Sequence, residues 1–225
     1  KQYEEDIIRK FDALIPISQE VKSWANEHAS FPIVVIPMGL GIDEMPEIKA
    51  GKNFFHIGSM EWLPNKEACE SLVLKVWPKI VAIDKDCHLH LAGKGMDSSF
   101  RDWESPNVHI HGEVESAKDF MNANNCMIIP LKSASGLRIK ALEAMSLGKP
   151  IVSTKIGMSG INFTNRENCL IADTLEEQVQ AITLLANDEN LYCQIAENGY
   201  NFVATNYDYQ QVITKTINFY ESLIE

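Results

Sequence analysis

The sequence predicts an α/β protein with a doubly wound, Rossmann-like parallel sheet that helices cover on both faces. Two observations lead to this prediction. Short apolar segments alternate with segments of helical spacing between residues 53 and 206, which is typical of a parallel sheet with helical crossovers. Glycine turns follow the apolar segments, at Gly58, Gly93, Gly112 and Gly136. Ligands of such sheets bind beyond the carboxyl ends of the strands, so these turns mark the candidate site.

The individual elements follow from local patterns. A helix is expected at the start of the chain and another after the capping residue Ser18. Apolar residues at every fourth position from Ala68 to Ile80 predict a longer helix. Further helices are expected over residues 116–124, 136–147 and 208–225, and over two segments with acidic starts that end at Asn206. Strands are expected within residues 12–18, 31–43, 54–60, 87–92, 107–112, 126–130, 150–154 and 168–173.

The composition excludes some classes of function. The 225 residues carry a formal net charge of −11 with a pI near 5.0, which argues against a nucleic-acid-binding surface or a polybasic membrane anchor. No apolar run approaches the roughly 20 residues of a membrane-spanning helix. The five cysteines are widely spaced and contain no CxxC pair, so reduced thiols in a cytoplasmic protein are expected.

Residues 135–154, SGLRIKALEAMSLGKPIVST, place two cations and a carboxylate near the start of a predicted helix. The first amides of a helix lack partners and its dipole favours an anion, to which Gly136 leaves room. Arg138 and Lys140 oppose that dipole, which makes sense if they share a bound phosphate or diphosphate. The alternative is solvated surface charge.

Glu143 lies on the same predicted helix, about 20° around it from Gly136. A carboxylate at this position can accept hydrogen bonds from two hydroxyl groups, such as those of a ribose. The alternative is a buried glutamate paired with an arginine or a backbone amide.

Five motifs together resemble a known family. The stretch from Pro130 to Thr154 resembles the signature of GT-B retaining glycosyltransferases of family 4. The segments HIGSMEWLPNKEA, LHLAGKG, VHIHGEV and NCLIAD resemble the family's other motifs in order and approximate spacing. The resemblance implies three parts: residues 1–48 as the tail end of an N-terminal acceptor domain with its linker, 49–206 as the nucleotide-sugar donor-binding domain, and 207–225 as a helix that crosses back.

The resemblance also implies roles for particular residues. Glu143 corresponds to the second acid of the family's E-x7-E motif and is expected to hold the ribose, while Ser135 stands at the first acid. Arg138 and Lys140 are expected to replace cationic contacts to the diphosphate, because Ser59-Met60-Glu61 stands where the family has an arginine. The pattern is closest to a subgroup with G-x-R-x-K before the retained glutamate.

The turn around Gly112 is expected to recognise the nucleobase, again on the resemblance. The implied catalytic residues are Arg138, Lys140 and Glu143. The implied donor-binding residues are Gly58, Ser59, His111, Gly112, Glu113, Val114, Ser135, Gly136 and Leu137.

The resemblance implies a hexosyltransferase-type reaction, in which a sugar passes from a nucleotide diphosphate-sugar to an acceptor hydroxyl with retention, in polysaccharide or glycoconjugate synthesis. The implied acceptor is a glycan or lipid-linked glycan held by a missing N-terminal domain, which can also bring the protein to the inner face of the membrane. No cofactor, metal or nucleic acid is expected, and this fragment alone is expected to be nearly inactive. The alternatives are a GT-B-like UDP-sugar epimerase and a non-catalytic nucleotide-sugar-binding domain.

Two histidine pairs raise the alternative of a zinc site. His88 and His90 lie on one side of one predicted strand, and His109 and His111 on one side of the next. Acids or cysteines that could complete the site have no matching spacing, so satisfied core or turn histidines are the prediction.

Overall fold

The computed structural model describes residues 2–134 and 136–224. The chain forms two compact units, Lys1–Ile42 with Ala204–Glu225 as one and Asp43–Val203 as the other. The second unit contains the sheet and the predicted site residues that the structure describes. Ser135, at which the family's first acid was expected, lies outside the described residues.

Within the described residues, six strands form one parallel sheet in the order β3-β2-β1-β4-β5-β6, which confirms the predicted fold class. In the central strand β1, Phe54 is in register with Leu89 of β2 and with Cys126 of β4. The order reverses between β1 and β4, as in other doubly wound sheets. The strands are β1 (Asn53–Ile57), β2 (His88–Ala92), β3 (Val108–Gly112), β4 (Cys126–Ile129), β5 (Ile151–Ser153) and β6 (Leu170–Ile171).

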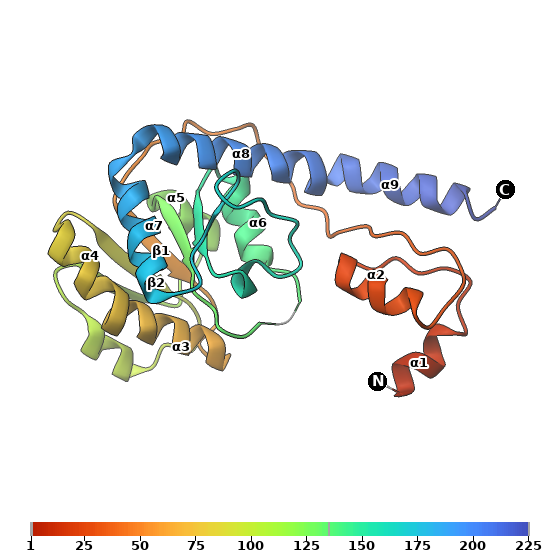
Figure 1. Cartoon of the computed structure of the whole chain (residues 1–225), viewed down its shortest axis with the longest axis horizontal. Helices are drawn as coiled ribbons and strands as arrows, with labels where there is room; N and C mark the ends of the chain where they lie inside the picture. The colour runs from red at the N-terminus through yellow and green to blue at the C-terminus, as the bar shows by residue number, and fades with distance from the viewer. Residues whose placement is uncertain (1, 135, 225) are drawn as a thin grey trace. The chain divides into compact units, whose positions relative to one another are not determined.

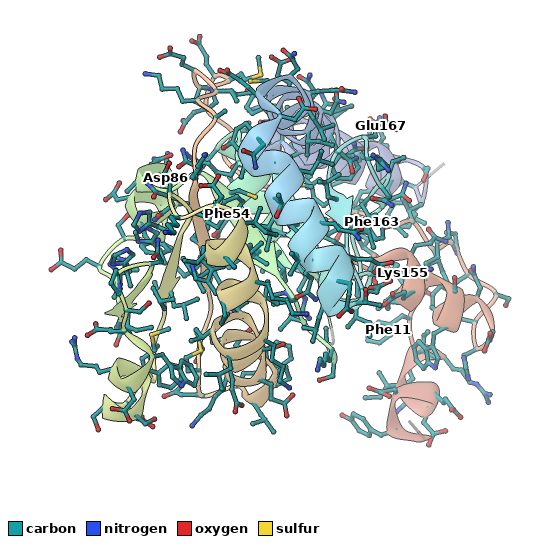
Figure 2. The ribbon with its side chains drawn as sticks, turned by 60° about the vertical axis from the view of Figure 1, so that its left-hand side comes forward. Phe11, Phe54, Asp86, Lys155, Phe163 and Glu167 are labelled. Carbon is teal, nitrogen blue, oxygen red and sulfur yellow. The ribbon has the colours of Figure 1, made fainter. Side chains whose placement is uncertain are left out.

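Aromatic side chains from successive positions of β1 pack against helices on opposite faces of the sheet. Phe54, labelled in Figure 2, is fully buried. Its ring meets the Trp77 ring edge-on, at 5.9 Å between centroids. The next residue, Phe55, meets Phe120 on the other face at 5.8 Å. The first face carries α3 (Leu63–Ser71), α4 (Trp77–Ile83) and α7 (Leu175–Asn187), and the second carries α5 (Ala117–Ala123). Because helices cover both faces of the sheet, successive residues of its strands are apolar in the sequence.

The helix expected over residues 65–83 is present but contains a π-helical segment. This segment, Leu72–Val76, separates α3 from α4 and leaves Leu74 53% exposed. Thr174 caps α7 in a full capping box with Glu177. The remaining elements of this region are the short helices Ser98–Trp103 and Ile156–Met158, α6 (Ile139–Ser146), and α8 (Glu189–Tyr207).

The unit formed by the two ends of the chain contains α1 (Gln2–Ile8), α2 (Gln19–Asn26) and α9 (Tyr209–Glu221). Ser18 caps α2 as predicted, by accepting a hydrogen bond from the Val21 amide. The strands expected over 12–18 and 31–43 are wrong, because these segments form only isolated bridges, Leu14 with Ile33 and Leu40 with Asp208. Prolines at 16, 32 and 37 lack the amide proton that a continued ladder requires.

Two glycine turns touch each other at the carboxyl edge of the sheet. The loops that end the strands, and the first turns of α3 and α6, lie along the lower edge of the sheet in Figure 1. A Cβ atom on Gly93 would lie 1.7 Å from the carbonyl oxygen of Gly58. Gly93 also donates its amide proton to the Gly112 carbonyl at 2.7 Å. The ends of β1, β2 and β3 are therefore tied together by backbone alone.

The close approach of Gly93 to Gly58 predicts a large cost for any side chain there. We expect Gly93→Ala to lower the free energy of unfolding by about 3 kcal/mol or more, because overpacking adds to the cost of a positive φ. Gly112→Ala is the matched control: its φ is +69°, but a Cβ there would meet no atom within 4 Å. It should cost only about 1–2 kcal/mol. Urea unfolding of both variants checks this; equal costs would contradict the role given to the Gly58–Gly93 contact.

Candidate functional site

The predicted site residues that the structure describes come from strand ends, from the loops that follow them and from α6. Gly58 and Ser59 follow β1, Gly112 and Glu113 end or follow β3, and Arg138 follows β4. Because β1 and β4 flank the point where the strand order reverses, the loops after them border the crevice in which such sheets bind ligands. The fold therefore brings the predicted residues to the edge expected for a binding site.

The turn after β1 is held rigidly by hydrogen bonds. The Gly58 amide donates to the Ala92 carbonyl at 3.1 Å, and the Asn65 side-chain amide donates to the Ser59 carbonyl at 2.9 Å. A Cβ on Gly58 would lie 2.6 Å from Nδ2 of Asn65, so a side chain there would push Asn65 away from the Ser59 carbonyl. The turn needs no ligand to order it.

The predicted base-recognition turn follows β3. His111 and Glu113 are exposed, and Val114 is half-buried. Gly112 has a φ of +69°, and a Cβ atom on it would meet no other atom within 4 Å, so its backbone is open on that side. The open space leaves room for a planar ligand beside this turn, as the sequence predicts for a nucleobase.

The helix expected to begin at Gly136 begins at Ile139 instead. Gly136 has a φ of +74°, a left-handed conformation that cannot start an α-helix, and Arg138 is the N-cap residue. The amides of Gly136 and Leu137 therefore belong to a loop, and the angle expected between Gly136 and Glu143 does not apply. A Cβ atom on Gly136 would also meet no other atom within 4 Å, so this loop backbone is open, like that at Gly112.

The Arg138 side chain folds back over its own loop. Its Nε and Nη2 atoms donate to the Gly136 carbonyl at 3.3 and 3.0 Å. Its guanidinium carbon lies 5.3 Å from the ring centroid of Trp62, which belongs to the turn after β1. Partial burial lowers the pKa of Arg138 from its ordinary value, but the group stays charged at neutral pH. A cation therefore stands where the two loops that border the crevice meet.

Lys140 and Glu143 form an ion pair on α6 that the sequence interpretation missed. Nζ of Lys140 donates to Oε2 of Glu143 at 2.6 Å, while the two side chains keep 45% and 35% exposure. Glu143 is thus neither a fully buried glutamate nor paired with an arginine. The i,i+3 spacing on a helix surface was the available signal for this pair.

The four histidines form a stack across β2 and β3. Successive ring centroids lie 5.2, 4.6 and 5.3 Å apart in the order His88, His109, His90 and His111. Nδ1 of His88 is 3.0 Å from Nε2 of His109, and His90 and His111 repeat this geometry. At this distance one nitrogen donates a hydrogen bond and the other accepts it. The prediction of satisfied histidines is therefore only partly confirmed, because Nε2 of His90 is buried without a hydrogen-bond partner among the described residues.

Two negative findings apply to the described part of the chain. No group of three or more histidine, cysteine, aspartate or glutamate side chains there is arranged to hold a metal ion. Its helices also lack the combination of length and apolar character needed to cross a bilayer.

Comparisons with known proteins point to one family. A family model described as "Glycosyl transferases group 1" matches residues 51–188. A Klebsiella pneumoniae protein named "Uncharacterized 44.6 kDa protein in cps region" is 24% identical over 173 residues, which are 72% of this chain and 44% of the relative. A Haemophilus influenzae protein named "Uncharacterized glycosyltransferase" is 24% identical over 154 residues, 63% of this chain and 42% of the relative. The chain spans less than half the length of these curated relatives.

Solved structures show the same fold. A variant of S. aureus TarM in complex with UDP superposes with a TM-score of 0.79 and 18% identity, over 97% of this chain and 46% of that chain. The pneumococcal O-GlcNAc transferase GtfA in complex with UDP and GlcNAc gives 0.77 and 12%, over 99% and 47%. Anabaena HepE in complex with UDP-glucose gives 0.76 and 13%, over 98% and 67%. These neighbours are GT-B glycosyltransferases, and the doubly wound sheet described above is their fold.

The histidine stack predicts pH-dependent stability. Burial and then the neighbouring histidines lower the pKa of His90 to about 4, and burial lowers the pKa values of His109 and His111. The unfolded chain, with histidine pKa values near 6.5, then binds more protons than the folded protein between about pH 6.5 and 4. Stability is expected to be complete above pH 6.5 and to fall as the pH falls through that window.

Urea unfolding of the wild-type protein and of His90→Gln at several pH values tests this expectation. The slope of the unfolding free energy against pH should be smaller for His90→Gln between pH 6.5 and 4.5. Parallel curves would show that His90 does not carry the dependence.

Proposed function

This chain belongs to the glycosyl transferases group 1 family, and on that premise we propose that it binds the donor of a retaining, hexosyltransferase-type glycosyltransferase. The donor is a nucleotide diphosphate-sugar, and the reaction passes its sugar to an acceptor hydroxyl. The observation that carries the proposal is the position of Arg138, Lys140 and Glu143 in the loop and helix that follow β4, beside the reversal in strand order.

The two cations suit the diphosphate. When the bond between sugar and diphosphate breaks, the leaving group gains negative charge, and fixed positive groups nearby lower the barrier. Arg138 and Lys140 supply such groups, and the open loop backbone at Gly136 and Leu137 supplies amides. Because the chain carries a net charge of −11, an anionic donor needs these local cations to be attracted at all.

In this proposal, the donor breaks the ion pair between Lys140 and Glu143 and binds both side chains. The ribose hydroxyls take the Glu143 carboxylate as acceptor, and the diphosphate takes the ammonium group of Lys140. Both side chains remain partly exposed, and exposed ion pairs stabilise proteins by only about 0–1 kcal/mol. Breaking this pair therefore costs little compared with charge-assisted hydrogen bonds to a ligand, at about 1.5–3 kcal/mol each.

We propose UDP as the nucleotide, bound with its base against the Gly112 turn. The support comes from the neighbours of known structure, three of which are described in complexes with UDP or UDP-glucose. The open backbone at Gly112 and the exposed His111 and Glu113 leave this turn accessible to a base.

We further propose that the acceptor is a glycan or lipid-linked glycan of a surface polysaccharide, held by a part of the protein outside this chain. The relative named for a cps region supports the polysaccharide, and its greater length supports a further part. The cytoplasm, at the inner face of the membrane, is the proposed location; the five free cysteines fit a reducing compartment. We propose that neither a metal nor another cofactor takes part, because cationic side chains meet the diphosphate.

Nucleotide binding tests the proposed function. UDP at millimolar concentration should raise the melting temperature of this chain, because a ligand that binds only the folded state stabilises it by mass action. Differential scanning fluorimetry with UDP, GDP and ADP measures this, with uridine as the control that lacks phosphate. No stabilisation by any of the three diphosphates would overturn the proposal, and stabilisation by GDP or ADP alone would overturn only the choice of UDP.

The role of Glu143 is tested with a UDP analogue that lacks both ribose hydroxyls. The wild-type protein should bind UDP about tenfold or more tightly than the analogue, since hydrogen bonds to a charged group contribute about 1.5–3 kcal/mol. Glu143→Gln should lose most of this preference in isothermal titration calorimetry. Glu176→Gln is the matched control, because Glu176 pairs with Lys79 at 3.5 Å on the surface of α7. If Glu143→Gln keeps the wild-type preference, the carboxylate does not hold the ribose.

A further inference from the structure

Trp62 is a large aromatic residue at the mouth of the proposed donor site. It lies in the turn between β1 and α3, where it is the N-cap residue of α3. Trp77 lies in the core, and Trp103 packs against the core. Trp62 is half-buried and is absent from that cluster of described residues. The segment from Gly58 to Pro64 contains no lysine or arginine, so this turn brings a ring, and not a cation, to the site.

The indole ring contacts the cation from the neighbouring loop. The guanidinium carbon of Arg138 lies 5.3 Å from the ring centroid, within the range of a cation–π interaction. Arg138 and Trp62 are 76 residues apart, but β1 and β4 are adjacent strands, with Phe55 in register with Met127. The loops after these two strands therefore meet, and the contact joins the two sides of the crevice.

Hydrogen bonds to neighbouring residues hold both partners of this contact. The Trp62 amide donates to the Ser59 carbonyl at 3.3 Å, and the Trp62 carbonyl accepts from the Asn65 amide at 3.0 Å. The Arg138 guanidinium donates to the Gly136 carbonyl through Nε and Nη2. A guanidinium held by a carbonyl on its edge and by a ring against its face has few of the rotamers open to a free arginine.

We propose that Trp62 is a positioning residue, which holds the Arg138 guanidinium at the crevice so that it meets the diphosphate of the donor. This inference rests on the proposed function. The ring face leaves the guanidinium charged and able to donate hydrogen bonds, whereas a carboxylate partner would neutralise it and compete with the phosphate. The turn after β1 thus supplies no cation of its own but supplies the ring that fixes Arg138 of the loop after β4.

A double-mutant cycle on UDP binding tests the proposal. Isothermal titration calorimetry gives the dissociation constants of the wild-type chain, Trp62→Leu, Arg138→Met and the double variant. Trp62→Leu should raise the dissociation constant about threefold to fivefold, the range of an exposed cation–π contact. In the Arg138→Met background the same change should have no effect, because Trp62 acts through Arg138.

Two further variants separate positioning from folding. Trp62→Phe keeps an aromatic face and should bind UDP within about twofold of the wild type. Trp103→Leu removes a partly buried tryptophan that packs against the core, and it should leave the dissociation constant unchanged in both backgrounds. Melting temperatures without nucleotide show whether each variant is folded.

The outcomes distinguish the inference from the proposed function. If the wild-type chain binds no nucleoside diphosphate, both fail together. If the wild type binds UDP and Trp62→Leu weakens binding equally with and without Arg138, Trp62 does not act through Arg138 and only the positioning role is wrong. The positioning role fails in the same way if Trp62→Phe binds as weakly as Trp62→Leu.

Discussion

The site depends on the contact between Gly58 and Gly93, where two strands end against each other. A single methyl group at Gly93 would occupy the space of the Gly58 carbonyl oxygen, so the two backbones approach as closely as the peptide chain allows. A side chain at Gly58 would displace Asn65, which fills that space. With side chains absent from these turns, the carboxyl edge stays open to a ligand, while the hydrogen bonds from Gly58 and Gly93 keep it ordered.

The charges of the site are arranged on this fixed edge so that each has a partner within the protein. Lys140 pairs with Glu143, and Arg138 contacts the Gly136 carbonyl and the Trp62 ring. The partners named here are weak ones: a partly exposed carboxylate, a neutral carbonyl and an aromatic face. In the proposed function, a diphosphate with two or more negative charges competes with them. An acidic protein can in this way keep three charged groups ordered and still leave them available to an anionic ligand.

The sequence predicts the sheet and its helices well because apolar periodicity and glycine turns are local signals. It fails where the outcome depends on distant or special backbone geometry. Residues 12–18 read as a strand, but prolines leave them only single bridges. Gly136 reads as the first helical residue, but its left-handed backbone delays α6 to Ile139. The sequence places the loops of the site at the correct edge of the sheet. The i,i+3 spacing of Lys140 and Glu143 could also have predicted their pair. The contact of Trp62 with Arg138 has no local signal, because it joins two loops whose residues are 76 positions apart.

The later start of α6 also changes the meaning of its cations. Arg138 lies outside the helix as its N-cap residue, so the helix dipole opposes it less than a first-turn position implies. Lys140 remains in the first turn, where a cation costs about 0.3–1 kcal/mol. Its ion pair with Glu143 stabilises the folded protein by about 0.3–0.5 kcal/mol. The two terms nearly cancel, so Lys140 gives the folded protein little or no stability. Lys140 can therefore exchange its pair with Glu143 for a ligand at little cost in stability, as the proposed function requires.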